Sequence, residues 1–182
     1  MVNNQTTQSV AVGRVLLLID WDNFIHSLID RFGNSETRIE ERLQKLIEWI
    51  KGELGELMDG GFVFAPEHLI YHYQEICRRN GLKLMVCPKI PKTENMEKDQ
   101  DTVDENIIEF AEMMIGHRNL ETVCLVSGDG DYVPLLEKMG REGIKRAIAP
   151  PAINSLSGEL IELIDENPKT GKKMVLMLDR IL

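Results

Sequence analysis

The sequence has few cysteines and no long apolar run, and each shortage excludes a class of protein. The 3 cysteines among 182 residues form no CxxC pair, which excludes a disulfide framework and a zinc knuckle. The longest apolar run near the start, Val15 to Ile19, is too short to span a bilayer, and no cationic segment precedes it as in a secretion signal. We therefore expect a cytoplasmic protein that does not enter a membrane.

Positive charge and aromatic residues are also scarce. The chain has 21 Lys and Arg against 30 Asp and Glu, a formal net charge of -9 with neutral histidines. This balance excludes a protein that coats nucleic acid by bulk electrostatics, so any phosphate contact must be local, through a basic patch or bound cations. Trp21, Trp49 and the tyrosines are too scattered along the chain to predict a platform for base stacking.

The remaining composition is that of a single globular domain. The chain is 43% hydrophobic, which is enough for one core. Residues 1–12 are polar and without periodicity, so we expect a flexible N-terminal tail followed by one domain over residues 13–182. From Arg14 onward, short runs rich in Val, Ile and Leu alternate with longer amphipathic stretches. This alternation is typical of an α/β fold with a parallel sheet.

The elements can be placed from these patterns. Strands are expected at residues 14–20, 61–65, 82–87, 122–127 and 144–150. Helices are expected at residues 23–31, 38–58, 66–80, 103–115, 132–142 and 156–164. Prolines and charges predict an exposed loop at residues 88–100. The stretch from Asn167 to the end fits either an edge strand or a short helix.

Aspartates follow two of the expected strands. Asp20 comes directly after VLLLI, and Asp129 and Asp131 follow VCLV in the segment SGDGD. Ligands of open α/β sheets bind outside the carboxyl ends of the strands, so Asp20 and Asp129 should converge if their strands are neighbours. Converging carboxylates repel one another unless a cation lies between them, and Mg²⁺ or Mn²⁺ accepts such oxygen ligands.

A third acidic group opens the helix expected at residues 103–115. Asp104 heads the row of Ile107, Ile108 and Ala111, so it points toward the sheet. Each acid also has a structural explanation, since Thr102 and Glu105 fit a capping box and Asp131 fits a helix N-cap. Three acidic groups at one sheet edge favour a metal site, because independent capping roles give no reason for them to converge.

The segments LLLIDWDNF, KDQDTVDENIIEFA and CLVSGDGDYVPLLEKMGREGIKRAIAP resemble, in order and spacing, the three acidic motifs of the NYN domains. This branch of the PIN-like nuclease superfamily includes the LabA/DUF88 proteins, and the resemblance spans about residues 14 to 150. It implies a PIN-like, Rossmann-like three-layer fold with a central parallel sheet of order 3-2-1-4-5. It also implies an acidic pocket that binds Mg²⁺ or Mn²⁺ and hydrolyses RNA phosphodiester bonds.

Carried over by position, the resemblance assigns a role to each motif. Asp20 is the first metal ligand with Asn23 as its polar neighbour, and the third motif contributes Ser127. In the middle motif, a lysine followed three residues later by an acid gives Lys98 and Asp101, whereas the helix face favours Asp104. The predicted catalytic and metal-binding residues are Asp20, Asp104, Asp129 and Asp131, with Asp101 as a further candidate ligand. Asn23, Ser127 and Lys98 are predicted to support the substrate or the acids.

The expected partners are RNA and a divalent metal, with a homo-oligomer also compatible with the sequence. Local basic residues could contact RNA, although most charges of this kind are solvated helix faces. These basic residues are Arg78, Arg79, Lys89, Lys92, Lys138, Arg141, Lys145 and Arg146.

Two other functions stay open from the sequence. The same fold could be a non-catalytic module that binds RNA or protein. Asp20 and Asp22 after a strand also fit a haloacid-dehalogenase-type phosphatase, in which the first Asp is a covalent nucleophile and the second a general acid. Ser127 directly adjoins GDGD, where that phosphatase family keeps its motifs apart.

Overall fold

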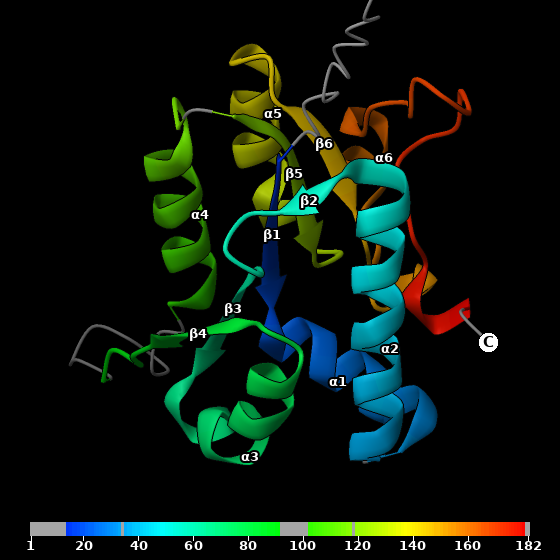
Figure 1. Ribbon diagram of the computed structural model, residues 1–182. Helices are drawn as coiled ribbons and strands as arrows, with labels where there is room; N and C mark the ends of the chain where they lie inside the picture. Colours follow the sequence, from blue (N-terminus) through cyan, green and yellow to red (C-terminus); the bar gives the residue numbers. More distant parts are fainter. Residues whose placement is uncertain (1–13, 34, 92–101, 118, 181–182) are drawn as a thin grey trace, which may run out of the picture.

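A parallel sheet forms the middle layer of the computed structural model, which describes residues 14–33, 35–91, 102–117 and 119–180 (Figure 1). Its strands are β1 (Arg14–Asp20), β3 (Phe62–Pro66), β4 (Lys83–Cys87), β5 (Leu120–Val126) and β6 (Lys145–Ile148). They pair in the order β4-β3-β1-β5-β6, which is 3-2-1-4-5 when these strands are numbered along the chain. The two-residue strand β2 (Glu56–Leu57) pairs with β1 outside this order and is the one difference from the predicted sheet. The predicted α/β class is confirmed.

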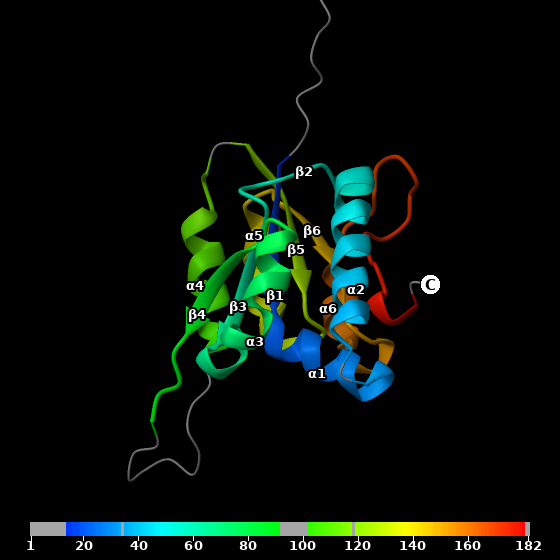
Figure 2. The ribbon, with the colours of Figure 1, turned by 60° about the horizontal axis from the view of Figure 1, so that its bottom comes forward.

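Helices cover both faces of the sheet. The helices are α1 (Trp21–Phe32), α2 (Glu36–Trp49), α3 (Glu67–Arg79), α4 (Val103–Met114), α5 (Val133–Arg141) and α6 (Gly158–Leu163). Figures 1 and 2 show α2 and α4 on opposite sides of the strands. The chain passes from β1 to β3 and β4 in one direction across the sheet, so right-handed crossovers place α1 to α3 on one face. It then returns to β5 and β6 in the opposite direction, which places α4 and α5 on the other face.

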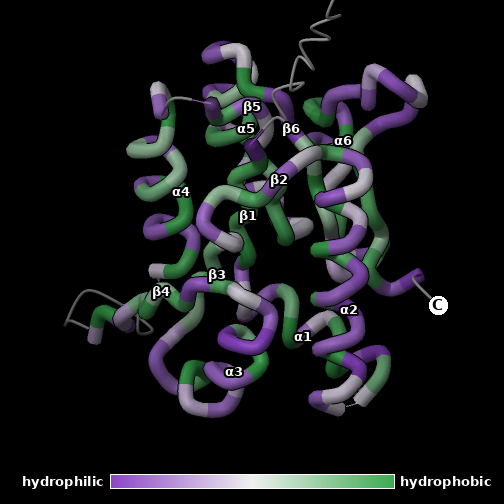
Figure 3. The backbone as a smooth tube through the Cα atoms, viewed as in Figure 1, coloured by the Kyte–Doolittle hydropathy of each residue, from purple (hydrophilic) through white to green (hydrophobic). Residues whose placement is uncertain are grey.

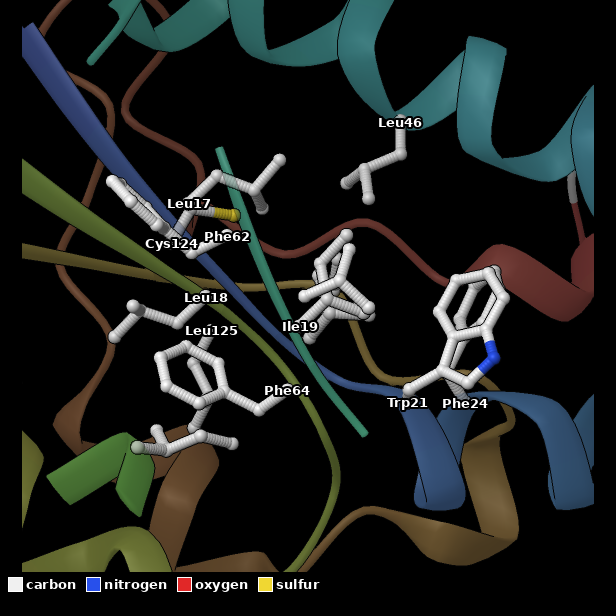
Figure 4. Close-up of a cluster of buried hydrophobic side chains, with 14 of the residues drawn as sticks. Leu17, Leu18, Ile19, Trp21, Phe24, Leu46, Phe62, Phe64, Cys124 and Leu125 are labelled. Carbon is white, nitrogen blue, oxygen red and sulfur yellow. The ribbon is translucent and has the colours of Figure 1, made fainter. Parts of the chain in front are cut away.

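The core lies along the two faces of β1, which is buried from Val15 onward. Hydrophobic residues concentrate on the sheet and on the helix faces that cover it (Figure 3). Ile19 of β1 and Leu46 of α2 belong to one cluster of buried side chains (Figure 4). On α4, the ring of Phe110 packs against the rings of Phe62 and Phe64 at tilted and edge-on angles, with centroids 4.6 and 5.5 Å apart. This packing fixes where the carboxyl ends of the strands meet α1 and α4.

The long helix predicted at residues 38–58 is wrong at its C-terminal end. α2 ends at Trp49, a π-helical segment η1 (Ile50–Leu54) follows, and β2 begins at Glu56. Gly55 between them has a φ of 137°, a conformation that L side chains rarely adopt, and it ends the helical path. Apolar residues continue at helical spacing past Trp49, which is why the pattern predicted a longer helix.

The C-terminal stretch forms neither the edge strand nor the short α-helix that the sequence left open, within the residues that the structure describes. It makes isolated bridges between Ile148 and Val175 and between Glu166 and Lys173, and it ends in a 3₁₀ turn, η4 (Leu178–Arg180). The predicted N-terminal tail at residues 1–12 lies outside the described residues, and so do residues 92–100 of the predicted loop. In the described part of the chain, no helix combines the length and apolar character of a membrane span.

Candidate functional site

The carboxyl ends of β1 and β5 are adjacent, since Ile19 pairs with Val126. Asp20, the last residue of β1, caps α1 by accepting a hydrogen bond from the Asn23 N–H to Oδ1 at 3.0 Å. After β5, Asp129 caps the 3₁₀ turn η2 (Gly130–Tyr132) by accepting from the Asp131 N–H at 3.1 Å. The two strands therefore deliver their aspartates to the same edge of the sheet, as the sequence predicted.

These aspartates line an open pocket of about 180 Å³ together with the start of α4. The pocket walls come from three segments that are distant in the sequence. Its lining residues are Asp20, Asp22, Asn23, Val103, Asp104 and Asp129. Asp104 thus points to the sheet edge rather than to bulk water, as its helix position predicted.

The rim of the pocket carries a cluster of carboxylates. One oxygen each from Asp104, Asp129 and Asp131 lies within 4.8 Å of the others. Asp129 and Asp131 are exposed and Asp104 is half-buried. This all-oxygen donor set, which solvent can reach, fits a hard divalent cation such as Mg²⁺ or Mn²⁺.

Asp20 forms the interior of the pocket and is only 5% exposed. Its Oδ2 accepts hydrogen bonds from the Ser127 hydroxyl at 3.3 Å and from the Tyr132 hydroxyl at 3.2 Å. Burial raises the pKa of Asp20 to about 7, and the nearby charge of Asp104 adds to this rise, whereas the Asn23 N–H and Tyr132 oppose it. Near neutral pH, Asp20 is therefore partly protonated, unlike an ordinary aspartate.

Tyr132 joins the interior of the pocket to its rim. Its side chain is fully buried, and its hydroxyl lies within hydrogen-bond distance of both Asp20 Oδ2 and Asp104 Oδ1, so its one proton is donated to either carboxylate but not to both at once. Burial, with the two neighbouring carboxylates, raises the pKa of this tyrosine above its ordinary value, so the hydroxyl keeps its proton. Tyr132 is not among the residues that the sequence predicts for the site. Its place directly after SGDGD was the available signal, but the contacts depend on the tertiary fold.

Gly128 allows the loop after β5 to pack closely on the chain beyond β6. A Cβ at this position would lie 2.1 Å from the carbonyl oxygen of Ser155, which ends the 3₁₀ turn η3 (Ile153–Ser155). The Ser157 N–H also donates to the Gly128 carbonyl at 2.9 Å. The glycine before Asp129 therefore has a packing reason, because any side chain there would push the loop away from the pocket.

Two capping explanations for the acids do not fit the structure. The Thr102 hydroxyl donates to the carbonyl of Pro88 at 2.6 Å and makes no capping bond to α4, so this half of the capping box is absent. Asp129, rather than Asp131, caps the turn after β5.

Other candidates lie beside the pocket or outside the described residues. Asp22, which the site prediction omitted, lines the pocket and lies 3.4 Å from Nε2 of His26. Lys98 and Asp101 fall outside the described residues, so the structure does not place them.

Several of the candidate basic residues serve surface ion pairs. Arg78 pairs with Glu75 at 2.7 Å, and Arg79 pairs with Glu40 at 2.8 Å. Lys138, Arg141 and Arg146 pair in the same way with Glu112, Glu137 and Asp165. Lys92 lies outside the described residues. Lys89 differs from the paired residues because it lines a pocket at the end of β4.

Comparisons with known proteins agree with this architecture. A solved protein of unknown function from Vibrio parahaemolyticus RIMD 2210633 matches with a TM-score of 0.69 and 20% identity, over 96% of this chain and 99% of that chain. At this identity the likeness shows the fold alone. A PLP-bound protein from Clostridium difficile 630 matches at 12% identity over 71% of this chain and 40% of that chain, but its TM-score of 0.23 carries no argument.

The comparison with curated proteins gave no match. The family model of the NYN domain matches residues 14–166, a range that contains β1, α4, β5 and the whole acidic pocket. The chain therefore belongs to the NYN domain family of the PIN-like nuclease superfamily.

Proposed function

We propose that this NYN domain is a ribonuclease that hydrolyses RNA phosphodiester bonds with Mg²⁺ or Mn²⁺ held in the acidic pocket. The observation that carries the proposal is the convergence of carboxylates from β1, the start of α4 and the loop after β5. Membership of a nuclease-type family supports the reaction class. RNA as the substrate follows from the resemblance of the three acidic motifs.

The acids of the rim and of the interior would have different roles in binding the cation. Asp104, Asp129 and Asp131 would hold the cation from the rim, and Asp20 would support it from the interior. When bound, such a cation supplies a water of lowered pKa and a positive charge that faces the phosphate. The protein needs no nucleophile of its own for this reaction.

The neighbours of Asp20 keep the pocket in one arrangement. The backbone N–H of Asn23 contacts Oδ1 of Asp20, while the hydroxyls of Ser127 and Tyr132 contact Oδ2. Because the groups are already oriented, little reorganisation is required when charge develops during the reaction.

The geometry of Asp20 speaks against the phosphatase alternative. A covalent nucleophile needs a carboxylate oxygen that can approach the phosphorus atom. Both oxygens of Asp20 accept hydrogen bonds, and the residue is 5% exposed. These contacts suit a carboxylate that supports the rim from the interior better than an attacking group.

The proposal is tested with end-labelled single-stranded RNA and the purified protein. We expect cleavage with Mn²⁺ or Mg²⁺ and none after chelation. Loss of a residue that only supports a metal ligand typically costs 10–100-fold, so Asp129→Asn should lower the cleavage rate by about 100-fold or more. The matched control is Glu41→Gln, at an exposed position of α2, which covers the face of the sheet opposite α4. This variant should cut RNA like the parent.

The melting temperature separates loss of function from loss of fold. Asp129→Asn should melt at the parent temperature or higher, because it relieves repulsion among the rim carboxylates. Parallel Asp101→Asn and Asp104→Asn variants distinguish the two candidates in the middle motif, and we expect the larger loss at Asp104.

Two results would contradict the proposal in different ways. If Asp129→Asn cuts as fast as the parent, the catalytic site is elsewhere. If the parent binds RNA but cuts none with either metal, the domain is a non-catalytic binding module.

A further inference from the structure

A second pocket lies at the same edge of the sheet as the acidic pocket. It has a volume of about 410 Å³ and forms where α3 begins after β3 and where the chain leaves β4. We call it the Tyr71 pocket, and its lining residues are Glu67, His68, Tyr71, Pro88 and Lys89. This volume falls in the range of pockets that hold small ligands, so a single nucleobase fits.

The two pockets are close neighbours. Strands β1, β3 and β4 are adjacent, so the end of β4 lies two strand spacings, about 10 Å, from the end of β1. The hydrogen bond from the Thr102 hydroxyl to the Pro88 carbonyl holds the start of α4 against the chain that leaves β4. Pro88 lines the Tyr71 pocket, and Thr102 immediately precedes Val103 and Asp104 of the acidic pocket.

The aromatic ring of the Tyr71 pocket is unusually accessible. Tyr71 is 76% exposed, whereas Tyr73, Tyr132 and Trp21 are all buried. Two other exposed apolar side chains, Val86 and Ile90, lie on β4 and just after it. An exposed ring beside a pocket offers a stacking face that every base can use, because each base has a π-face.

Charge in this pocket complements RNA better than charge in the acidic pocket. Lys89 provides a positive charge. His68 adds a ring with hydrogen-bonding nitrogens, while the carboxylate of Glu67 can accept from the amino group of a base. The pocket therefore offers a stacking face, a phosphate contact and an acceptor at one place.

We propose that the Tyr71 pocket holds one unpaired nucleobase of the RNA whose backbone enters the acidic pocket. This inference rests on the proposed function, since it takes RNA as the ligand of the neighbouring site. A base that is stacked and paired in a duplex cannot reach the ring, so the proposal makes single-stranded RNA the substrate. The aromatic residues are too scattered along the sequence to predict a stacking platform, but the single exposed ring of Tyr71 can provide one.

Binding can be measured without cleavage in the parent protein, with an RNA whose phosphodiester linkages are replaced by non-hydrolysable phosphonates. The probe is a short single-stranded RNA with a fluorescent end label, in Mg²⁺, followed by anisotropy. Adding Tyr71→Ala should weaken binding by about tenfold or more, the effect expected for one base stack. Tyr71→Phe keeps the ring and should restore the affinity. Met113→Ala, at a 68% exposed position near the far end of α4, is the control.

An abasic scan tests the position of the pocket relative to the scissile bond. In an RNA that the parent cleaves, one nucleotide at a time is replaced by an abasic residue. We expect one fixed distance from the cleaved bond at which the loss of the base slows cleavage. In Tyr71→Ala the same replacement should cause no further loss, because the ring that held the base is gone.

The outcomes separate this proposal from the ribonuclease proposal. If Tyr71→Ala binds single-stranded RNA as tightly as the parent, or if the parent prefers a duplex, the base pocket is overturned and the ribonuclease can stand. If the parent cuts no RNA but Tyr71→Ala weakens binding, the ribonuclease falls and the base pocket stands. If the parent binds no RNA, both fall.

Discussion

The interior and the rim of the acidic pocket hold their carboxylates in different ways. Asp20 in the interior is 5% exposed, and its oxygens contact the backbone N–H of Asn23 and the hydroxyls of Ser127 and Tyr132. Asp129 and Asp131 on the rim are exposed, and their side chains lie with Asp104 in one cluster of like charge. The difference indicates that the fold orients the interior carboxylate, whereas a cation is the group best suited to relieve the repulsion at the rim.

Tyr132 contacts both the interior and the rim of the acidic pocket. Its hydroxyl contacts Asp20 Oδ2 and Asp104 Oδ1, so it sets how far the interior carboxylate lies from the rim. A metal site depends on such outer contacts as well as on its direct ligands. Changes to Tyr132 and to Asp20 therefore test whether interior and rim act together.

The larger effect is expected from Tyr132→Phe. The variant keeps the buried ring but removes the hydroxyl that orients both carboxylates. We expect Mn²⁺ affinity, measured by titration calorimetry, to fall by about 10–100-fold, and cleavage to fall with it. Tyr73→Phe alters another buried tyrosine, which stacks on Trp21 rather than lining the acidic pocket, and should leave both quantities unchanged. Unchanged Mn²⁺ affinity in Tyr132→Phe would show that rim and interior are independent.

A smaller effect is expected in the pH dependence of stability. Burial raises the pKa of Asp20 to about 7, above its value of about 3.9 in an unfolded chain. The protonated form is therefore favoured in the folded state, and its contribution to the free energy of unfolding is lost as the pH rises from about 4 to 7. Without metal, Asp20→Asn should remove this loss and melt above the parent at pH 8, by roughly 2–4 °C for each kcal/mol recovered.

The same measurement at pH 5 is the control for this prediction. There the parent Asp20 is already protonated, so the advantage of Asp20→Asn should shrink. An equal difference between the two proteins at both pH values would mean that Asp20 does not titrate in the folded protein near pH 7.

Much of the acidic pocket could be predicted from the sequence, because it depends on local rules. Asp20 and Asp129 come directly after apolar strands, and parallel strands bring their carboxyl ends to one edge. The helical spacing of Ile107 and Ala111 indicated which way Asp104 points. These three positions needed only strand ends and a helix face.

Other features needed contacts between distant segments. Tyr132 contacts Asp20 across 112 positions, and no spacing rule predicts that hydroxyl's partners. The Tyr71 pocket joins the start of α3 to the residues after β4, and only the folded chain shows which tyrosine stays exposed. The end of α2 was missed for a different reason, because the positive φ of Gly55 outweighed an apolar pattern that continued past it.

The most direct test of the central claim is a crystal of this protein soaked in Mn²⁺ and measured at a wavelength where manganese scatters anomalously. We predict a peak in the acidic pocket within coordination distance of carboxylates from both the α4 end and the loop after β5, Asp104 and Asp129 among them. The peak should be absent in Asp129→Asn. A well-ordered crystal with no peak in this pocket, or with manganese bound only elsewhere, would contradict the account.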